Sequence, residues 1–173
     1  GEPRFVLYAT NMQTGRSFRF RQDMLADWKL GMARGASVPL AQAVAASSAF
    51  PPIFSPIVVE TDPAAWAEGE DIPQLDQLRR RIVLTDGGVY DNMGINPLVR
   101  ARNALDYVIV SDGGKPFALD ERPTESGAIV LKAALDIMTT YASPRALATM
   151  SAPSRPPAPG LFSTTIGWPN RVP

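Results

Sequence analysis

The chain has 173 residues, 45% of them apolar and 20% charged, which supports one globular domain with a buried core and argues against a disordered polypeptide. Seventeen basic and seventeen acidic residues cancel, so no long-range field favours nucleic acid as a partner. The chain contains neither cysteine nor histidine, which excludes disulfides, thiolate nucleophiles and imidazole bases, so general base chemistry falls to aspartate or glutamate.

The first elements predicted along the chain are two strands of a hairpin. A strand over residues 4–10 leads into a tight connection at Asn11–Gly15, and the alternating stretch Arg16–Arg21 predicts the second strand. The stretch that follows, to about Ala36, is mixed in pattern and predicts no element.

A short helix is predicted next. Ser37 can cap it, Pro39 lies in its first turn, and the small apolar run over residues 40–48 indicates a buried helix that a Phe-Pro-Pro sequence ends. Residues 53–59 read as extended, and the proline at position 56 favours an edge or irregular strand over a central one.

Residues 60–80 change abruptly in composition to Asp, Glu, Ala and Pro, with Trp66 as the large aromatic. This predicts a surface excursion, and a solvated loop with a helical turn is favoured over a lid covering a site. The basic triplet at residues 79–81 is interpreted as the solvated end of the next strand rather than as a contact for anionic headgroups.

An apolar strand at residues 81–85 delivers Asp86 into a turn that contains Gly87 and Gly88. A sheet fixes the backbone at a strand's end, and the glycines allow positive φ angles and leave room for another group, which is how a fold presents a working carboxylate. On these residues alone, however, an ordinary Asp-Gly turn is the favoured interpretation.

The remaining elements are a helix that begins at Asn96, a second buried strand over residues 107–111 that ends at Asp112, and a helix over 125–141. An alternation of strand, helix and strand is typical of a parallel sheet covered by helices, with the site at its carboxyl edge. Residues 151–173 are predicted to be a Pro-rich extended tail.

Two chemistries fit carboxylates at such an edge. In the first, Asp86, Asp91 and Asp112 converge on magnesium, as in phosphoryl-transfer enzymes that use carboxylate clusters. In the second, a single aspartate is the general base for a nucleophile from another part of the fold.

Three blocks occur in order along the chain: Phe5-Val-Leu-Tyr-Ala-Thr-Asn-Met-Gln-Thr-Gly15, then Val38-Pro-Leu-Ala-Gln-Ala-Val-Ala-Ala-Ser-Ser-Ala-Phe-Pro-Pro-Ile-Phe-Ser-Pro56, then Leu84-Thr-Asp-Gly-Gly-Val-Tyr-Asp-Asn-Met-Gly-Ile-Asn-Pro97. Their combination resembles the patatin-like phospholipase family. The resemblance implies an α/β fold with a partial three-layer α/β/α sheet and helices on both faces, spanning residues 1–150. It also implies a lipid acyl hydrolase with a Ser-Asp dyad, without a metal or other cofactor.

Asp86 matches the aspartate of the family's dyad and is expected to be its general base. Gly87, Gly88, Asp91 and Asn92 are predicted to support the loop, because Asx side chains satisfy backbone groups in tight turns. Asp86 is expected to be ionised at neutral pH, since N–H groups of the turn oppose a rise in its pKa. Asp112 is interpreted as holding its own turn rather than lining the site.

The family's nucleophile is the serine of a Gly-x-Ser-x-Gly elbow, which this sequence lacks. Gly35–Pro39 comes nearest, without the closing glycine or a preceding strand, and Ser47 and Ser48 in an Ala-rich helix are weak candidates. The chain is therefore expected to be the C-terminal portion of the catalytic domain, inactive alone, with the serine and the Gly-rich oxyanion loop on a missing N-terminal segment.

The expected partner is a lipid acyl ester, and a peripheral contact with a membrane is compatible with it. Phe54, Met93 and Ile95 are candidates to line an acyl groove, although ordinary core packing explains them equally well. A carboxylate-metal phosphatase that uses Asp86 and Asp112, and a noncatalytic lipid-binding domain, are the alternatives. No apolar run approaches the roughly 20 residues that span a bilayer, and residues 1–4 do not resemble a signal peptide, so the cytoplasm and a membrane surface both stay open.

Overall fold

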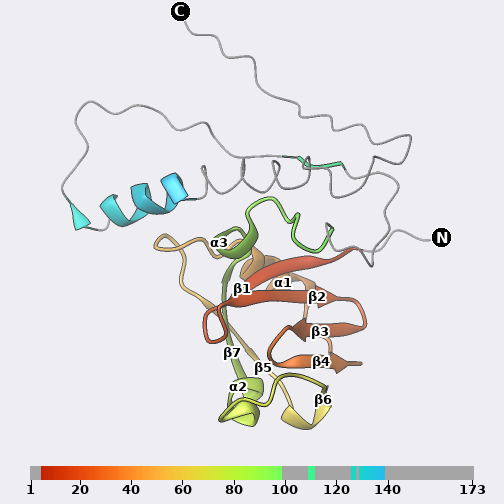
Figure 1. Ribbon diagram of the computed structural model, residues 1–173. Coiled ribbons are helices and arrows are strands. Elements are labelled where there is room, and N and C mark those ends of the chain that lie inside the picture. Colours follow the sequence, from red (N-terminus) through yellow and green to blue (C-terminus); the bar gives the residue numbers. More distant parts are fainter. Residues whose placement is uncertain (1–4, 99–108, 112–125, 128, 139–173) are drawn as a thin grey trace, which may run out of the picture.

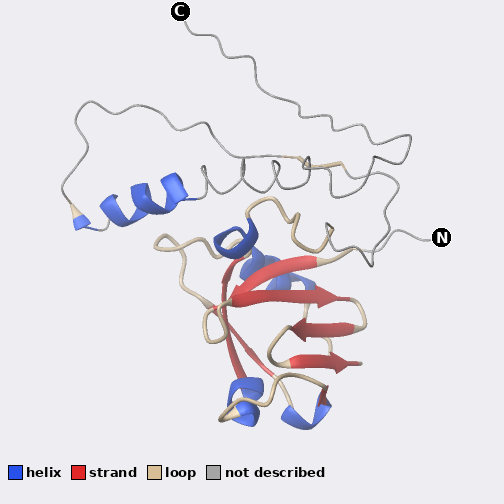
Figure 2. Cartoon of the chain, viewed as in Figure 1, coloured by secondary structure: helices blue, strands red, loops and turns tan. Residues whose placement is uncertain are grey.

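The computed structural model describes residues 5–98, 109–111, 126–127 and 129–138 (Figure 1). Its strands are β1 (Leu7–Asn11), β2 (Arg16–Arg21), β3 (Met24–Asp27), β4 (Gly31–Arg34), β5 (Ile57–Glu60), β6 (Trp66–Ala67) and β7 (Arg81–Asp86). Its helices within residues 5–98 are α1 (Leu40–Ser47), the 3₁₀ turn η1 (Pro63–Ala65), α2 (Leu75–Arg80) and α3 (Gly88–Asp91). Figure 2 shows the strands of the described part gathered in one sheet, together with the short helices and the connecting loops.

The strands form one curled, seven-stranded sheet in the order β5-β7-β1-β2-β3-β4-β6. Every pairing within the described residues is antiparallel. The expectation of a parallel sheet is therefore wrong for this part of the chain. It rested on a second strand at residues 107–111, of which 109–111 are not in a strand, while 107 and 108 lie outside the described residues. The α/β class is observed, whereas the three-layer arrangement stays a prediction.

The first four strands form a meander. The predicted hairpin is confirmed, with Ala9 of β1 paired to Phe18 of β2. In β2, Phe18 and Phe20 are buried while the residues between and around them are less so, as the period of a strand requires. The next strand, β3, is buried at all four positions. It therefore has no alternation of polar and apolar residues, which is why the sequence pattern did not reveal it.

Helix α1 lies where it was expected, but Ser37 does not cap it. The residue at the N-cap is Pro39, which makes no side-chain capping bond, and Ser37 is exposed. Proline fixes the entry to the helix through its φ of −53°. The helix buries Ala43 and Ala46, whereas Leu40 is 72% exposed, so only one face of it joins the core.

β5 forms the edge of the sheet beside β7, which confirms the edge strand predicted from the proline at position 56. The strand begins directly after this proline. β7 itself is confirmed and extends to Asp86. Most of the segment 60–80 is exposed, but it also builds the opposite edge of the sheet. There Trp66 of β6 pairs with Ala33 of β4, and its side chain is 6% exposed.

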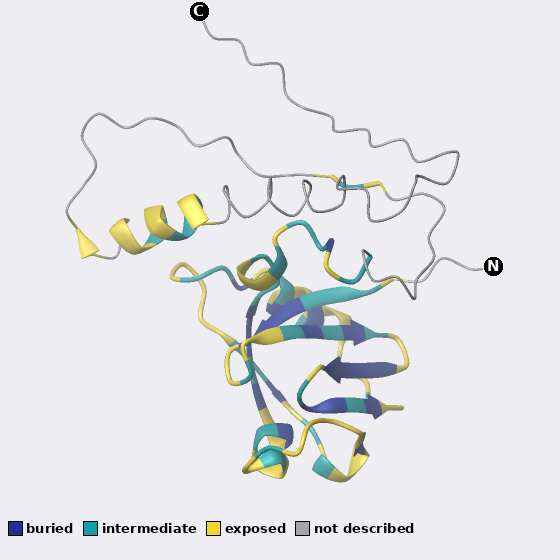
Figure 3. Ribbon diagram, in the orientation of Figure 1, coloured by how far each residue is buried: buried dark blue, intermediate teal, exposed yellow. Residues whose placement is uncertain are grey.

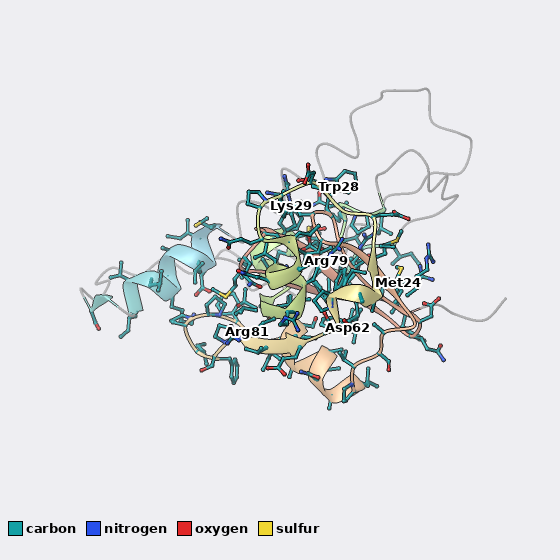
Figure 4. The ribbon with its side chains drawn as sticks, turned by 90° about the horizontal axis from the view of Figure 1, so that it is seen from below. Met24, Trp28, Lys29, Asp62, Arg79 and Arg81 are labelled. Atoms are coloured by element: carbon teal, nitrogen blue, oxygen red, sulfur yellow. The ribbon has the colours of Figure 1, made fainter. Side chains whose placement is uncertain are left out.

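Arg79 is buried, so the interpretation of the basic triplet as a solvated strand end is wrong at this residue. It lies in α2 and donates hydrogen bonds to the carbonyl oxygens of Leu30 and Glu68. Figure 4 shows it between α2 and the turn that carries Trp28 and Lys29. The Arg79 side chain thus reaches the turn between β3 and β4 and the segment after β6, which a strand assignment could not predict.

The core lies between the meander, β7 and α1, and Figure 3 colours much of the ribbon of these elements as buried. Burying each large apolar side chain stabilises the fold by about 1.5–3 kcal/mol. The cluster consists of Ala9, Phe18, Phe20, Leu25, Leu30, Ala33, Ala43, Ala46, Val59, Trp66, Ile82 and Leu84. Side chains of both β7 and α1 belong to this cluster. The core therefore holds in place the ends of β7 and α1 and the residues that directly follow them.

Beyond residue 98 the structure describes only short stretches. Residues 127 and 129–138 are helical, within the helix predicted over 125–141. The predicted helix that begins at Asn96 lies mostly outside the described residues, as do Asp112 and the tail 151–173. In the part of the chain that is described, no helix has the length and apolarity needed to cross a membrane.

Candidate active site

Asp86 is the last residue of β7 and lies opposite Ala9 of β1. Helix α3 begins two residues later and lies at this end of β7 (Figure 1). The aspartate is half-buried. A strand with neighbours on both sides thus delivers the carboxylate to the end of the sheet, where the polypeptide turns away and leaves the side chain accessible.

Both polar groups of the Asp86 backbone are bound. Its N–H donates to the carbonyl oxygen of Ala49 at 3.1 Å, and its carbonyl accepts from the Thr10 hydroxyl at 2.8 Å. The next residue, Gly87, donates its N–H to the carbonyl of Ser47 at 3.3 Å. The turn is therefore attached to β1 on one side and to the end of α1 on the other.

The two carboxylate oxygens of Asp86 have different surroundings. Oδ1 accepts a hydrogen bond from the N–H of Gly88 at 2.7 Å, whereas Oδ2 accepts none from any described residue. Every fully buried side-chain oxygen or nitrogen in the described part of the chain has a hydrogen-bond partner, so Oδ2 is not fully buried. One oxygen is thus anchored, and the other can take a proton from an incoming group.

Burial raises the pKa of the Asp86 carboxyl above its ordinary value because it disfavours the charged form. The hydrogen bond from Gly88 lowers the pKa, but by less than burial raises it. The amide of Gly88 opposes the rise in the pKa, as expected, but it does not offset the effect of burial. Among the described residues, only this amide of the turn donates to the carboxylate.

Gly87 and Gly88 are required because neighbouring atoms leave no room for a Cβ atom, and not because their φ angles are positive. Gly87 has a φ of −63°, and neither glycine has a left-handed backbone. A Cβ atom at Gly87 would lie 2.5 Å from the carbonyl oxygen of Tyr8, and one at Gly88 would lie 2.9 Å from Asp86 Oδ1. The backbone of the turn therefore packs directly on β1 and on the carboxylate itself.

Asp91 ends α3 and binds the loop that follows. Its Oδ1 accepts from the N–H of Ile95 at 3.3 Å, and its Oδ2 accepts from the N–H of Asn96 at 2.8 Å. The Oδ1 atom of Asn92 lies where a Cβ at Gly88 would approach to 2.8 Å. The side chains of Asp91 and Asn92 therefore lie beside the turn. Each carboxylate oxygen of Asp91 accepts a hydrogen bond from a backbone N–H.

The three serines considered from the sequence do not bond to Asp86. Ser48 donates its hydroxyl to the carbonyl of Val44 at 2.8 Å, and Ser37 is exposed. Ser47 reaches the turn through its backbone carbonyl. Within the described residues, no serine hydroxyl is hydrogen-bonded to the carboxylate.

The three residues expected to line an acyl groove differ in how far they are exposed. Ile95 is 1% exposed and belongs to the interior, Phe54 is 59% exposed, and Met93 is intermediate. The described residues contain no group of three or more carboxylates placed to hold a metal ion. Asp112, the partner of Asp86 in the phosphatase alternative, lies outside the described residues.

Sequence reasoning missed Thr85 and Thr10, which surround Asp86. Thr85 is 5% exposed and donates its hydroxyl to the carbonyl of Ala49 at 2.7 Å. Thr10 and Thr85 are cross-strand partners. A threonine that directly follows a buried apolar residue, Ala9 in β1 and Leu84 in β7, was the signal that could have identified each of them.

The family model described as patatin-like phospholipase matches residues 3–99. This range contains the three sequence blocks, the sheet and Asp86, and it confirms the resemblance. Among curated proteins, no match was found. Since the matched range covers more than half of the 173 residues, the chain belongs to the patatin-like phospholipase family, a family of lipid acyl hydrolases.

Proposed function

We propose that Asp86 is the general base of a Ser-Asp dyad that hydrolyses acyl esters of lipids. The proposed nucleophile is a serine on a segment of the same domain that precedes these residues, because the printed sequence contains no Gly-x-Ser-x-Gly. The observation that carries the proposal is the asymmetric carboxylate of Asp86. It has one oxygen held by Gly88 and one accessible oxygen, and it lies inside the range that matches the family.

The reaction proceeds in two acyl transfers. In the first, the serine Oγ forms a bond to the ester carbonyl carbon while its proton passes to Asp86 Oδ2. The tetrahedral intermediate collapses, the bond to the alcohol oxygen breaks, and the proton leaves with that alcohol. In the second, water attacks the acyl-enzyme, Asp86 takes its proton, and the serine recovers a proton as the fatty acid departs.

The surroundings of Asp86 suit this role. The Gly88 N–H fixes Oδ1, which restricts rotation of the carboxylate and keeps Oδ2 toward the accessible side. Burial raises the pKa of the carboxyl, which makes its ionised form a stronger base than an ordinary aspartate. Because only the ionised form accepts a proton, activity should fall as acidity increases, with the acid limb at a higher pH than an ordinary aspartate would give.

The neighbouring residues have supporting roles in this proposal. Gly87 and Gly88 let the turn approach β1 and the carboxylate, and Asp91 holds the loop after α3. Asn92 is assigned to the same support. The substrate is a lipid acyl ester that the protein meets by peripheral contact with a membrane or lipid aggregate, and no metal takes part.

Replacing Asp86 with asparagine in the full-length protein tests the proposal. Asparagine keeps the shape and can still accept the Gly88 N–H, but it cannot accept a proton. We expect kcat on a p-nitrophenyl acyl ester to fall by about 10²–10⁴-fold. Asp23→Asn, at an exposed position on the β2–β3 turn, is the matched control and should retain activity. Full activity in Asp86→Asn would refute the assignment.

The same assay separates the alternatives. A noncatalytic lipid-binding domain would bind liposomes without hydrolysing esters, and a phosphatase would release phosphate only with magnesium present. The 173-residue chain alone is expected to be inactive. If the chain alone does hydrolyse esters, and Ser47→Ala abolishes that activity, the nucleophile lies in α1 instead.

A further inference from the structure

Three consecutive residues, the last two of β7 and the glycine after them, donate hydrogen bonds to residues 47 and 49, at and just after the end of α1. The Thr85 hydroxyl donates to the carbonyl of Ala49 at 2.7 Å, and the Asp86 N–H donates to the same carbonyl at 3.1 Å. The Gly87 N–H then donates to the carbonyl of Ser47. Residues 85–87, with the candidate base in the middle, are therefore attached to the short stretch 47–49.

The carbonyl of Ala49 is the shared point of this attachment. Thr85 is 5% exposed and Ala49 is 3% exposed, so water cannot readily replace a lost donor there. The Thr85 hydroxyl makes the shorter of the two bonds. It thereby fixes the orientation of the peptide group that the Asp86 amide uses as its acceptor.

We propose that Thr85 is a positioning residue for Asp86, and that it acts through the carbonyl of Ala49 without touching the substrate. The effect of Thr85 on catalysis rests on the proposed function of Asp86. The effect of Thr85 on structure, which is to fix the backbone at Asp86, does not depend on that function.

Thr10 supports the same residue from the opposite side. It lies across from Thr85 on β1 and donates its hydroxyl to the carbonyl of Asp86. Thr10 thus holds Asp86 to the sheet, whereas Thr85 holds it to the segment after α1. Loss of the Thr85 hydroxyl should leave the sheet intact and let the turn move relative to α1, which displaces Oδ2.

Nuclear magnetic resonance of the 173-residue chain tests the structural part. Thr85→Val replaces the hydroxyl with a methyl group of similar size. We expect it to shift the amide and carboxyl resonances of Asp86 and to accelerate exchange of the Asp86 amide by about tenfold or more. Thr85→Ser, which keeps the hydroxyl, should restore the original values.

Thr14→Val is the matched control. It also removes a hydroxyl that makes a 2.8 Å bond, here to Asp27 Oδ2, but it lies away from the turn on the β1–β2 connection. It should lower stability and leave the Asp86 resonances in place. If Thr85→Val lowers stability as Thr14→Val does and leaves those resonances unchanged, Thr85 is merely structural and the proposal is overturned.

Kinetics of the full-length protein test the catalytic part. Misplacement of a reacting group affects chemistry more than binding, so Thr85→Val should lower kcat by about tenfold or more with KM nearly unchanged. Thr85→Ser should recover most of kcat. An unchanged kcat, or a change confined to KM, would overturn the catalytic role of Thr85.

The two parts fail independently. If even the unsubstituted full-length protein hydrolyses no ester, the proposed function fails, while the resonances of Asp86 still decide the positioning role. If Thr85→Val does not fold, amide exchange in the unsubstituted chain decides it. Slow exchange at Asp86 and Gly87, retained in Thr85→Ser, supports the attachment, and exchange as fast as in an exposed turn overturns it.

Discussion

Asp27 and Asp86 occupy equivalent positions in two regions of the molecule, since each is the last residue of a strand. Asp27 ends β3 in the meander and is 1% exposed, whereas Asp86 ends β7 and is half-buried. Asp27 accepts four hydrogen bonds through its two carboxylate oxygens, and Asp86 accepts one. The supply of donors, rather than placement at a strand end, distinguishes the saturated carboxylate of Asp27 from that of Asp86, whose Oδ2 has no donor among the described residues.

The donors to Asp27 come from three separate parts of the meander. The Asn11 side chain and the Thr14 hydroxyl bind Oδ2, and the N–H groups of Lys29 and Leu30 bind Oδ1. The carboxylate thereby joins the β1–β2 connection to the turn after β3. Both of its oxygens hold hydrogen bonds and the side chain is buried, so neither oxygen faces an incoming substrate.

The largest expected effect on stability is that of Asp27→Ala. The substitution leaves buried donors without an acceptor, which should lower the free energy of unfolding by about 3–5 kcal/mol. Urea denaturation of the chain measures it. Asp86→Ala, measured in parallel, should cost far less because it strands only the Gly88 N–H at a partly accessible site. Equal losses would remove the distinction between the two aspartates.

Gly87→Ala should produce the next effect. Its Cβ would meet the Tyr8 carbonyl at 2.5 Å, and because that atom belongs to the backbone, relief requires a shift of β1 or of the turn. We expect a loss of about 1–3 kcal/mol in thermal or urea unfolding. Gly35→Ala is the control, since it has a positive φ but open space, and should cost about 1 kcal/mol. A neutral Gly87→Ala would contradict the close packing of the turn on β1.

A smaller effect is expected from Asp91→Ala, which removes the acceptor for the N–H groups of Ile95 and Asn96. Part of this loop is exposed, so water can replace the carboxylate, and stability should fall by about 1 kcal/mol. Amide exchange should accelerate at residues 95 and 96 and stay unchanged at Asp27. Faster exchange throughout the chain would indicate that Asp91 stabilises more than its own loop.

The smallest effect concerns pH. Burial raises the pKa of Asp86 in the folded protein, so the folded state binds the proton more tightly than the unfolded chain. The resulting stability is fully present below the ordinary pKa of 3.8 and is lost as pH rises through the raised value. The difference in Tm between Asp86→Asn and the unsubstituted chain should therefore favour Asp86→Asn more at neutral pH than near pH 3. A difference in Tm that is independent of pH would contradict burial as the dominant cause.

Local patterns predicted the elements that depend on local chemistry. Alternation in Arg16–Arg21, the apolar run before Asp86 and the prolines at 39 and 56 located β2, β7, α1 and β5. They failed at β3, whose residues are all buried, and at Arg79, whose partners are backbone carbonyls brought close only by folding. The antiparallel pairings of β7 with β1 and with β5 were likewise decided between strands that are not consecutive in the sequence.

The sequence by itself determined the family blocks, the absence of histidine and cysteine, and the placement of Asp86 after an apolar strand and before two glycines. Only the tertiary structure decided that Asp27 is saturated with donors, that Gly87 is required by contact with Tyr8, and that Thr85 shares an acceptor with Asp86. The physical reason is that burial and hydrogen bonding depend on partners from distant segments. The acceptor that Thr85 uses lies 36 residues away from it.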